Sequence, residues 1–153
     1  MAFYQLKREQ FIKATVDEVW EFMSSPKNLK EITPDHMGFN ITSDNKDEKM
    51  YEGMIVSYIV KPILSIPTKW VTEITHVVDK KYFVDEQRIG PYTMWHHQHI
   101  LEEVADGVIM KDIVTYQPPF GFLGAIANSL FIKSQLKAIF KYRFKAVDDK
   151  YNR

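Results

Sequence analysis

The sequence predicts an α+β fold: a curved antiparallel sheet of about seven strands, two short helices after the first strand, and a long C-terminal helix over the sheet. Two patterns predict it. Between residues 39 and 117, runs of β-forming residues alternate with turn residues, which is typical of strands joined by hairpins. From about residue 122 to 146, apolar residues recur at helical spacing. A sheet with one solvated face must cover the other, and this helix is the only element large enough to do so.

The N-terminal part predicts a strand followed by two short helices. Residues 3–13 are rich in apolar residues and have the character of a strand. Thr15 and Glu18 form a capping box, because each side chain can pair with a free backbone N–H at a helix start. Ser25 is the expected N-cap of the second helix, and Pro26 takes its first position. That helix is expected to run to about Ile32.

Six further strands are expected, separated by proline, glycine or polar turns. Their expected positions are 39–41, 51–60, 68–78, 82–88, 92–104 and 108–117. Asp106 and Gly107 are a strong hairpin signal between the last two strands. Pairing about that turn would place His99 near Val114 and diagonal to Asp112.

Composition limits the class of protein. The chain has 153 residues, which fits one domain over residues 1–153, and 45% of them are hydrophobic, so the chain can bury a core. Twenty basic and twenty acidic side chains balance, so no nucleic-acid partner is expected. The absence of cysteine excludes disulfides, thiol catalysis and cysteine-ligated metals. Neither a signal peptide nor a membrane-spanning run is recognisable, so a cytoplasmic location is expected.

A histidine-rich strand is the first candidate site. If residues 92–104 form a strand, Trp95, His97 and His99 share one face, whereas His96 lies on the other. Burying an indole and two imidazoles on one face is expensive without a purpose. Asp112 lies on the mostly apolar face of the next strand, where a carboxylate needs a partner such as His97 or His99.

Three interpretations of these histidines stay open. We favour a hydrogen-bonded network in which the imidazoles pair with Asp112, Gln87 or backbone groups and shape a pocket wall. Direct ligand contact or acid–base catalysis comes second, because histidine titrates near neutral pH. A metal site, with Asp112 or Asp85 as third ligand, is the least favoured, since a third histidine at ligand spacing is missing. We therefore expect neither a metal nor another cofactor.

The chain resembles the START-like superfamily, also called SRPBCC or helix-grip, in its polyketide cyclase/dehydrase and lipid-transport branch, and more narrowly the small bacterial ligand-binding SRPBCC domain proteins. The resemblance covers essentially the whole chain. The motifs that carry it are Trp70 with Glu73-Ile74, Phe83-Val84-Asp85-Glu86-Gln87, Gly90-Pro91-Tyr92, Trp95-His96-His97-Gln98-His99, Asp112-Ile113-Val114-Thr115-Tyr116, Pro119-Phe120-Gly121 and Ile139-Phe140-Lys141-Tyr142-Arg143. The resemblance implies a hydrophobic cavity for a lipid, polyketide, sterol or similar molecule, although fold alone does not fix function.

Binding or transport of a small hydrophobic ligand, between the sheet and the C-terminal helix, is the function we expect. The alternatives are a cyclase- or dehydratase-type enzyme and a protein–protein adaptor without ligand. The candidate catalytic residues are His97, His99 and Asp112. The candidate ligand-binding residues are Trp70, Gln87, Trp95, His97, His99, Asp112, Tyr116 and Arg143.

The C-terminal helix raises the question of further partners. Lys133, Lys137 and Lys141 stack at helical spacing beside apolar residues such as Leu123 and Leu130, a pattern that can dock on an anionic membrane. A solvated face is the favoured interpretation of the lysines, so membrane contact is possible but not expected. The protein is expected to be a monomer or a homodimer.

Overall fold

The computed structural model describes residues 3–62 and 65–153. Its strands are β1 (Tyr4–Ile12), β2 (Asn40–Ile41), β3 (Met54–Val60), β4 (Thr68–Val78), β5 (Tyr82–Ile89), β6 (Met94–Val104) and β7 (Gly107–Gln117). Its helical segments are α1 (Val16–Met23), η1 (Pro26–Ile32), η2 (Asp35–Met37), α2 (Gly121–Ala127), η3 (Asn128–Ile132) and α3 (Lys133–Tyr151).

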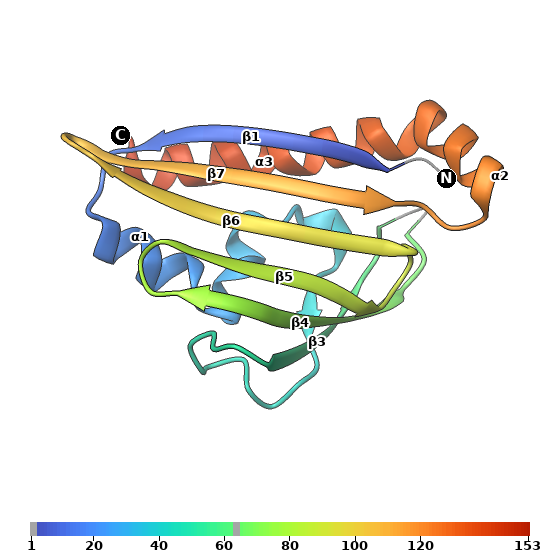
Figure 1. Cartoon of the computed structure of the whole chain (residues 1–153), viewed down its shortest axis with the longest axis horizontal. Helices are drawn as coiled ribbons and strands as arrows, with labels where there is room; N and C mark the ends of the chain where they lie inside the picture. The colour runs from blue at the N-terminus through green and yellow to red at the C-terminus, as the bar shows by residue number, and fades with distance from the viewer. Residues whose placement is uncertain (1–2, 63–64) are drawn as a thin grey trace.

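The seven strands form one antiparallel sheet in the order β1-β7-β6-β5-β4-β3-β2. Consecutive strands from β2 to β7 are neighbours, as expected for hairpin connections, and β1 pairs with β7 at the other edge. Figure 1 shows the long strands side by side with the C-terminal helix beyond β1 and β7. The predicted fold class is confirmed: this is an α+β helix-grip architecture.

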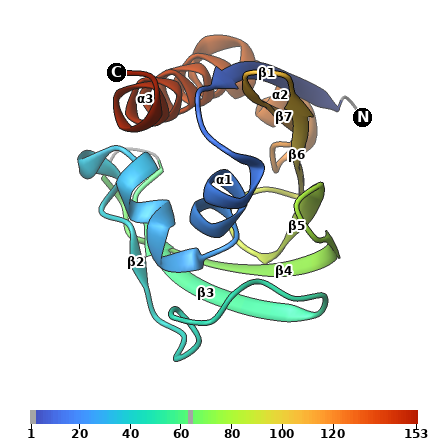
Figure 2. The ribbon, with the colours of Figure 1, turned by 90° about the vertical axis from the view of Figure 1, so that its left-hand side faces the viewer.

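The sheet curves, and its two edges approach each other across the C-terminal helix. α3 packs against β1 at one edge and against η1 near the other. Figure 2 shows α3 above the opening of the curved sheet and α1 within its near end. α1 contacts β6 and β7, so it closes that end of the sheet. α3, η1 and α1 therefore cover much of the concave face, and the interior of the protein lies between them and the sheet.

The capping interactions predicted for the first two helices are present at one helix start and partly absent at the other. The capping box is confirmed, since the Thr15 side chain accepts from the Glu18 N–H and the Glu18 carboxylate accepts from the Thr15 N–H. Pro26 does begin the second helix, which is a 3-10 helix ending at Ile32. Ser25 is the N-cap of this helix as expected, but its side chain makes no capping bond, because its hydroxyl donates to the carbonyl of Glu21. That bond terminates α1 rather than starting η1.

The register expected for the β6–β7 hairpin is wrong by two residues. Val104 pairs with Gly107, so Ala105 and Asp106 form the turn, and His99 lies directly opposite Asp112. Gly107 is the first residue of β7. A larger residue does not fit there, because its Cβ would collide with the Ile12 carbonyl of the neighbouring β1. A shift of two residues keeps each side chain on its face, so the inward face of the strand is the predicted one.

The C-terminal helix is longer and less regular than its periodicity predicts. It starts at Gly121 and continues to Tyr151, and a π-helical turn, η3, interrupts it at Asn128–Ile132. Its first part exposes apolar side chains, among them Phe122 at 75% and Leu130 at 72% exposure. No helix among the described residues is long and apolar enough to cross a membrane.

Two hydrophobic clusters fill the interior. One gathers around α1 and includes Trp20, Phe83 and Leu101. The other gathers under α3 and includes Trp70 and Phe140. β5, β6 and β7 run between the two clusters. Their buried polar side chains, His97, His99 and Asp112, lie between the two groups of apolar residues.

Candidate functional site

A cavity of about 130 Å³ lies between the sheet and α3. A single water needs about 10–15 Å³ on the same measure, so the space exceeds that of a few trapped waters. The cavity is walled mainly by apolar and aromatic side chains from β3 to β6, η1, η2 and α3. Its polar lining includes Thr72, Asp85, His97, His99 and Arg143.

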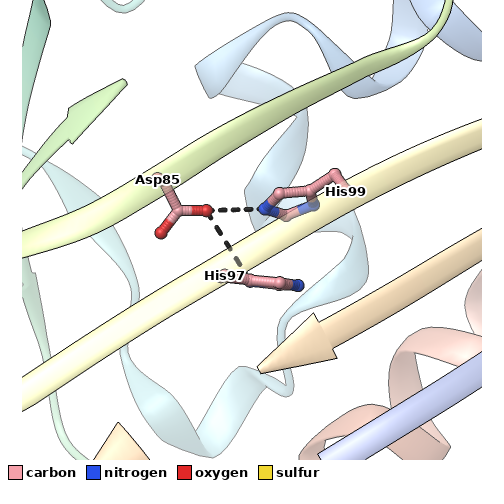
Figure 3. Close-up of side chains that lie close together, drawn as sticks. All are labelled: Asp85, His97 and His99. Carbon is pink, nitrogen blue, oxygen red and sulfur yellow. Dashed lines mark hydrogen bonds and ion pairs between the residues drawn. The ribbon is translucent and has the colours of Figure 1, made fainter. Parts of the chain in front are cut away.

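Two imidazoles lie between two carboxylates at one side of this cavity. His97 Nε2 is 2.7 Å from Asp112 Oδ1, and His99 Nε2 is 2.6 Å from Asp85 Oδ2. Figure 3 shows Asp85 from β5 directed at both rings from β6. The ring centroids are 3.6 Å apart, so the two imidazoles are in contact with each other. His97, His99 and Asp112 are each only 4% exposed.

The pairing is diagonal across the sheet. His97 stands directly opposite Asp85 but bonds Asp112, whereas His99 stands opposite Asp112 but bonds Asp85. The directly opposite pairs are longer, with 3.6 Å between His97 Nδ1 and Asp85 Oδ2 and 3.6 Å between His99 Nδ1 and Asp112 Oδ1. Each ring therefore presents one nitrogen to each carboxylate, which gives the cluster a crossed arrangement.

The electrostatics of the cluster fix its charges at neutral pH. Burial, together with the neighbouring His97, lowers the pKa of His99 to about 4, so this ring is neutral. Burial alone would raise the pKa of Asp85, but the hydrogen bond from His99 and the nearby His97 and Arg143 lower it. The pKa of Asp112 lies well below its ordinary value, because the bond from His97 and the charge of Arg143 outweigh burial. Both carboxylates are therefore ionised.

Arg143 brings the C-terminal helix into the cluster. Its Nη1 lies 3.6 Å from Asp112 Oδ1, and its side chain is 12% exposed. The guanidinium also lies 4.9 Å from the centre of the Phe140 ring, a cation–π distance. Its Nε and Nη1 have no hydrogen-bond partner among the described residues. Arg143 thus holds a buried charge with donors left to offer to a molecule in the cavity.

An aromatic wall faces the other part of the cavity. Trp70 stacks on Tyr58 with centroids 5.9 Å apart and meets Trp95 edge-on at 5.3 Å. Tyr92 packs against both indoles. The Trp70 Nε1–H is buried and finds no acceptor within the described part of the chain. A buried indole N–H normally has a hydrogen-bond acceptor, and a bound molecule could supply the acceptor that Trp70 lacks.

The structure separates the predicted site residues into two groups. Trp70, Trp95, His97, His99 and Arg143 line the cavity. The other three, Gln87, Asp112 and Tyr116, do not belong to its lining.

These three residues have structural partners instead. The Gln87 amide pairs with the backbone N–H and carbonyl of Tyr92, which fixes the Gly-Pro turn between β5 and β6. The Tyr116 hydroxyl donates to Asn128 Oδ1, and Asp112 holds His97. Their role as ligand contacts stays a prediction, and the contacts observed place them behind the wall.

Asp85 contacts both histidines, but it is not among the ligand-binding residues predicted from the sequence. The alternation of Phe83-Val84-Asp85 places Asp85 on the same face as the buried Phe83, so the signal was in the sequence. Sequence reasoning considered Asp85 only as a possible metal ligand, because nothing local shows that β5 lies beside β6 in this register. Tyr58 and Phe140 line the cavity as well and complete its apolar surface.

Comparison with solved structures supports the helix-grip fold. The protein CV1439 from Chromobacterium violaceum matches with a TM-score of 0.71 over 94% of both chains, at 10% identity. The structure of Ara h 8.0201 matches with a TM-score of 0.65 over 97% of both chains, at 12% identity. DynU16, a protein from the dynemicin biosynthetic locus, matches with a TM-score of 0.58 at 14% identity, over 96% of this chain and 48% of its own. At these identities the likeness shows the fold alone. No family model matches the chain, and no curated protein matches it.

Proposed function

We propose that this protein binds a small, mainly apolar molecule in the cavity between the sheet and α3. The observation that carries the proposal is the lining itself, in which aromatic and aliphatic side chains surround a few buried polar groups. This composition is typical of ligand pockets, where apolar walls supply affinity and a few polar groups fix orientation. The resemblance of the sequence motifs to ligand-binding SRPBCC domains supports the same function.

The bound molecule should carry a hydrogen-bond acceptor. Trp70 Nε1, Arg143 Nε and Arg143 Nη1 are buried donors that lack partners among the described residues, and both side chains line the cavity. A carbonyl, carboxylate or hydroxyl oxygen would satisfy such donors, and an unpaired buried donor otherwise costs about 1–3 kcal/mol. The ligand class that fits is therefore an apolar body with at least one oxygen.

A fluorescence titration with anilinonaphthalene sulfonate tests the proposal. This dye has an aromatic body and an anionic head, so we expect a single saturable site with enhanced emission. Leu136→Trp should abolish binding, because Leu136 lines the cavity and a larger ring fills it. Ala138→Trp is the matched control, since it adds the same side chain on the exposed face of α3. Wild-type protein that is folded but shows no saturable site would refute the proposal.

The crossed His–Asp pairs favour acid–base catalysis as a second candidate function. His97 lines the cavity while its Nε2 is held by Asp112, an arrangement that orients a ring for proton transfer. An enzyme of cyclase or dehydratase type would use such a ring on a carbonyl-containing substrate. If it operates, His97→Gln should abolish turnover of such a substrate while dye binding persists. Equal turnover by the variant would exclude this role.

A further inference from the structure

We propose that Asp85, His97 and His99 form a binding site for a divalent transition metal such as Zn²⁺ at the cavity wall. The three side chains each offer one ligand atom, and these atoms lie within 4.8 Å of one another. Two imidazoles and one carboxylate on one side of an ion leave positions free on the other side. The inference is independent of the ligand-binding proposal, because the cavity can hold an apolar molecule with or without a metal.

The distances suit an ion with small side-chain movements. Zinc binds nitrogen and carboxylate oxygen at about 2.0–2.2 Å, so tetrahedral ligand atoms lie roughly 3.4 Å apart. Asp85 Oδ2 and His97 Nδ1 are 3.6 Å apart, close to that spacing. Asp85 Oδ2 and His99 Nε2 are 2.6 Å apart, because a hydrogen bond joins them. If a metal ion replaces the shared proton, the distance between Asp85 Oδ2 and His99 Nε2 must increase by less than about 1 Å.

Asp112 holds His97 as an outer partner in this arrangement and lies near His99. With the metal on His97 Nδ1, the Nε2–H donates to Asp112 Oδ1 over 2.7 Å. With the metal on His99 Nε2, the ring proton moves to Nδ1, which lies 3.6 Å from the same oxygen. His99 Nδ1 has no hydrogen-bond partner among the described residues, so Asp112 would have to move slightly towards it to accept that proton. Metal-bound histidines characteristically donate their second N–H to a carboxylate, which orients the ring.

Charge selects the Asp85 side of the cluster for the cation. Arg143 lies 3.6 Å from Asp112, so a second cation at that carboxylate would be repelled. Asp85 lines the large cavity, whereas Asp112 borders only a space of about 10 Å³ beside Arg143, so the Asp85 side has the room for a further ligand.

Calorimetric titration of EDTA-treated protein with ZnCl₂ at pH 7 tests the inference. We expect one zinc per chain, and Co²⁺ should occupy the same site with visible ligand-field absorption. Asp85→Asn and His99→Gln each remove a ligand and should weaken zinc binding by at least 100-fold. Asp112→Asn should weaken it by about 10–100-fold, the range typical of outer partners. His96→Gln is the matched control, because His96 lies on the opposite face of the same strand.

Wild-type protein that binds no zinc, or zinc binding that Asp85→Asn and His99→Gln leave unchanged, would overturn the metal site. If a variant fails to fold, X-ray absorption spectroscopy of the zinc-loaded wild type still tests the site, because it reports how many imidazoles bind the zinc. Two imidazoles in the first coordination shell support the site, and any other number contradicts it. Dye binding that persists in EDTA while zinc fails to bind would refute the metal site and leave the ligand-binding proposal standing.

Discussion

At the scale of single residues, His97 and His99 form a crossed pairing with Asp112 and Asp85. Both rings are held by carboxylates at hydrogen-bond distance and stand at the wall of a cavity. Breaking a buried pair leaves an uncompensated charge, which costs far more than the net worth of the pair itself. Substitution of one member of the cluster is therefore expected to destabilise the fold, and a functional role of the cluster stays a proposal.

His99 should make folding stability depend on pH. Its pKa is about 4 in the folded protein against an ordinary value of 6.5, so between these values the unfolded chain binds more protons. The contribution of neutral His99 to the free energy of unfolding is fully present above pH 6.5. It is lost as the pH falls towards 4, by an amount on the order of 3 kcal/mol. Urea unfolding of wild type at several pH values in this window, compared with His99→Gln, should show a flatter dependence in the variant.

The groups that face His99 are Asp85, His97, Asp112 and Arg143. The lowered pKa values of the two carboxylates remove stability only at more acidic pH, so the window of His99 is separable. His76→Gln is the control, because this ring is exposed. Parallel curves for wild type and His99→Gln would contradict the assignment.

At the scale of elements, the junction between α2 and α3 depends on one hydrogen bond to the sheet. Asn128 begins the π-helical turn η3, is 3% exposed, and accepts at 2.6 Å from the Tyr116 hydroxyl at the end of β7. A π turn inserts into a helix where local packing demands it, and such turns are frequent at functional sites. The bond ties the start of α3, and with it the placement of Phe140 and Arg143, to the sheet.

Tyr116→Phe should destabilise the protein by about 1–3 kcal/mol, because it leaves the buried Asn128 carbonyl without its donor. Chemical denaturation followed by circular dichroism measures the change. Tyr142→Phe removes an exposed hydroxyl from the same helix and should change stability by less than about 0.5 kcal/mol. Equal effects of the two variants would show that the Tyr116 bond does not anchor the helix.

At the scale of the whole molecule, the sheet, α1 and α3 enclose a space that the hydrophobic clusters leave partly open. A molecule that binds the folded protein and not the unfolded chain stabilises the fold by mass action. The enclosed cavity therefore links ligand binding to global stability. The exposed apolar side chains of α2 and η3 lie outside this cavity, and their possible contact with a membrane stays a prediction.

Saturation of the cavity should raise the melting temperature. At a dye concentration of 100 times Kd, the fold gains about 2.7 kcal/mol, which corresponds to about 5–10 °C for a domain of this size. Scanning calorimetry with and without anilinonaphthalene sulfonate measures the shift. Leu136→Trp should show none, and Ala138→Trp should shift as wild type does. A shift that Leu136→Trp retains would place the dye outside the cavity.

The order of the main elements and the inward faces of β6 and β7 could be read from the sequence. Strand alternation alone places Trp95, His97 and His99 together, and the structure agrees, because side-chain direction depends only on the local backbone period. The capping box at Thr15 and Glu18 is equally local and was equally predictable. The interruption of the C-terminal helix was not, because the π turn depends on the contact of Asn128 with Tyr116.

The sequence by itself therefore determined the fold class and the inward placement of His97, His99 and Asp112. Only the tertiary structure decided which histidine meets which carboxylate. That choice depends on the register of β6 against both β5 and β7, and the turn at Ala105 and Asp106 moved the predicted register by two residues. It depends also on α3, which carries Arg143 to Asp112 from the far end of the chain. Contacts between residues distant in sequence leave no local periodicity, so the crossed cluster appears only when the chain is folded.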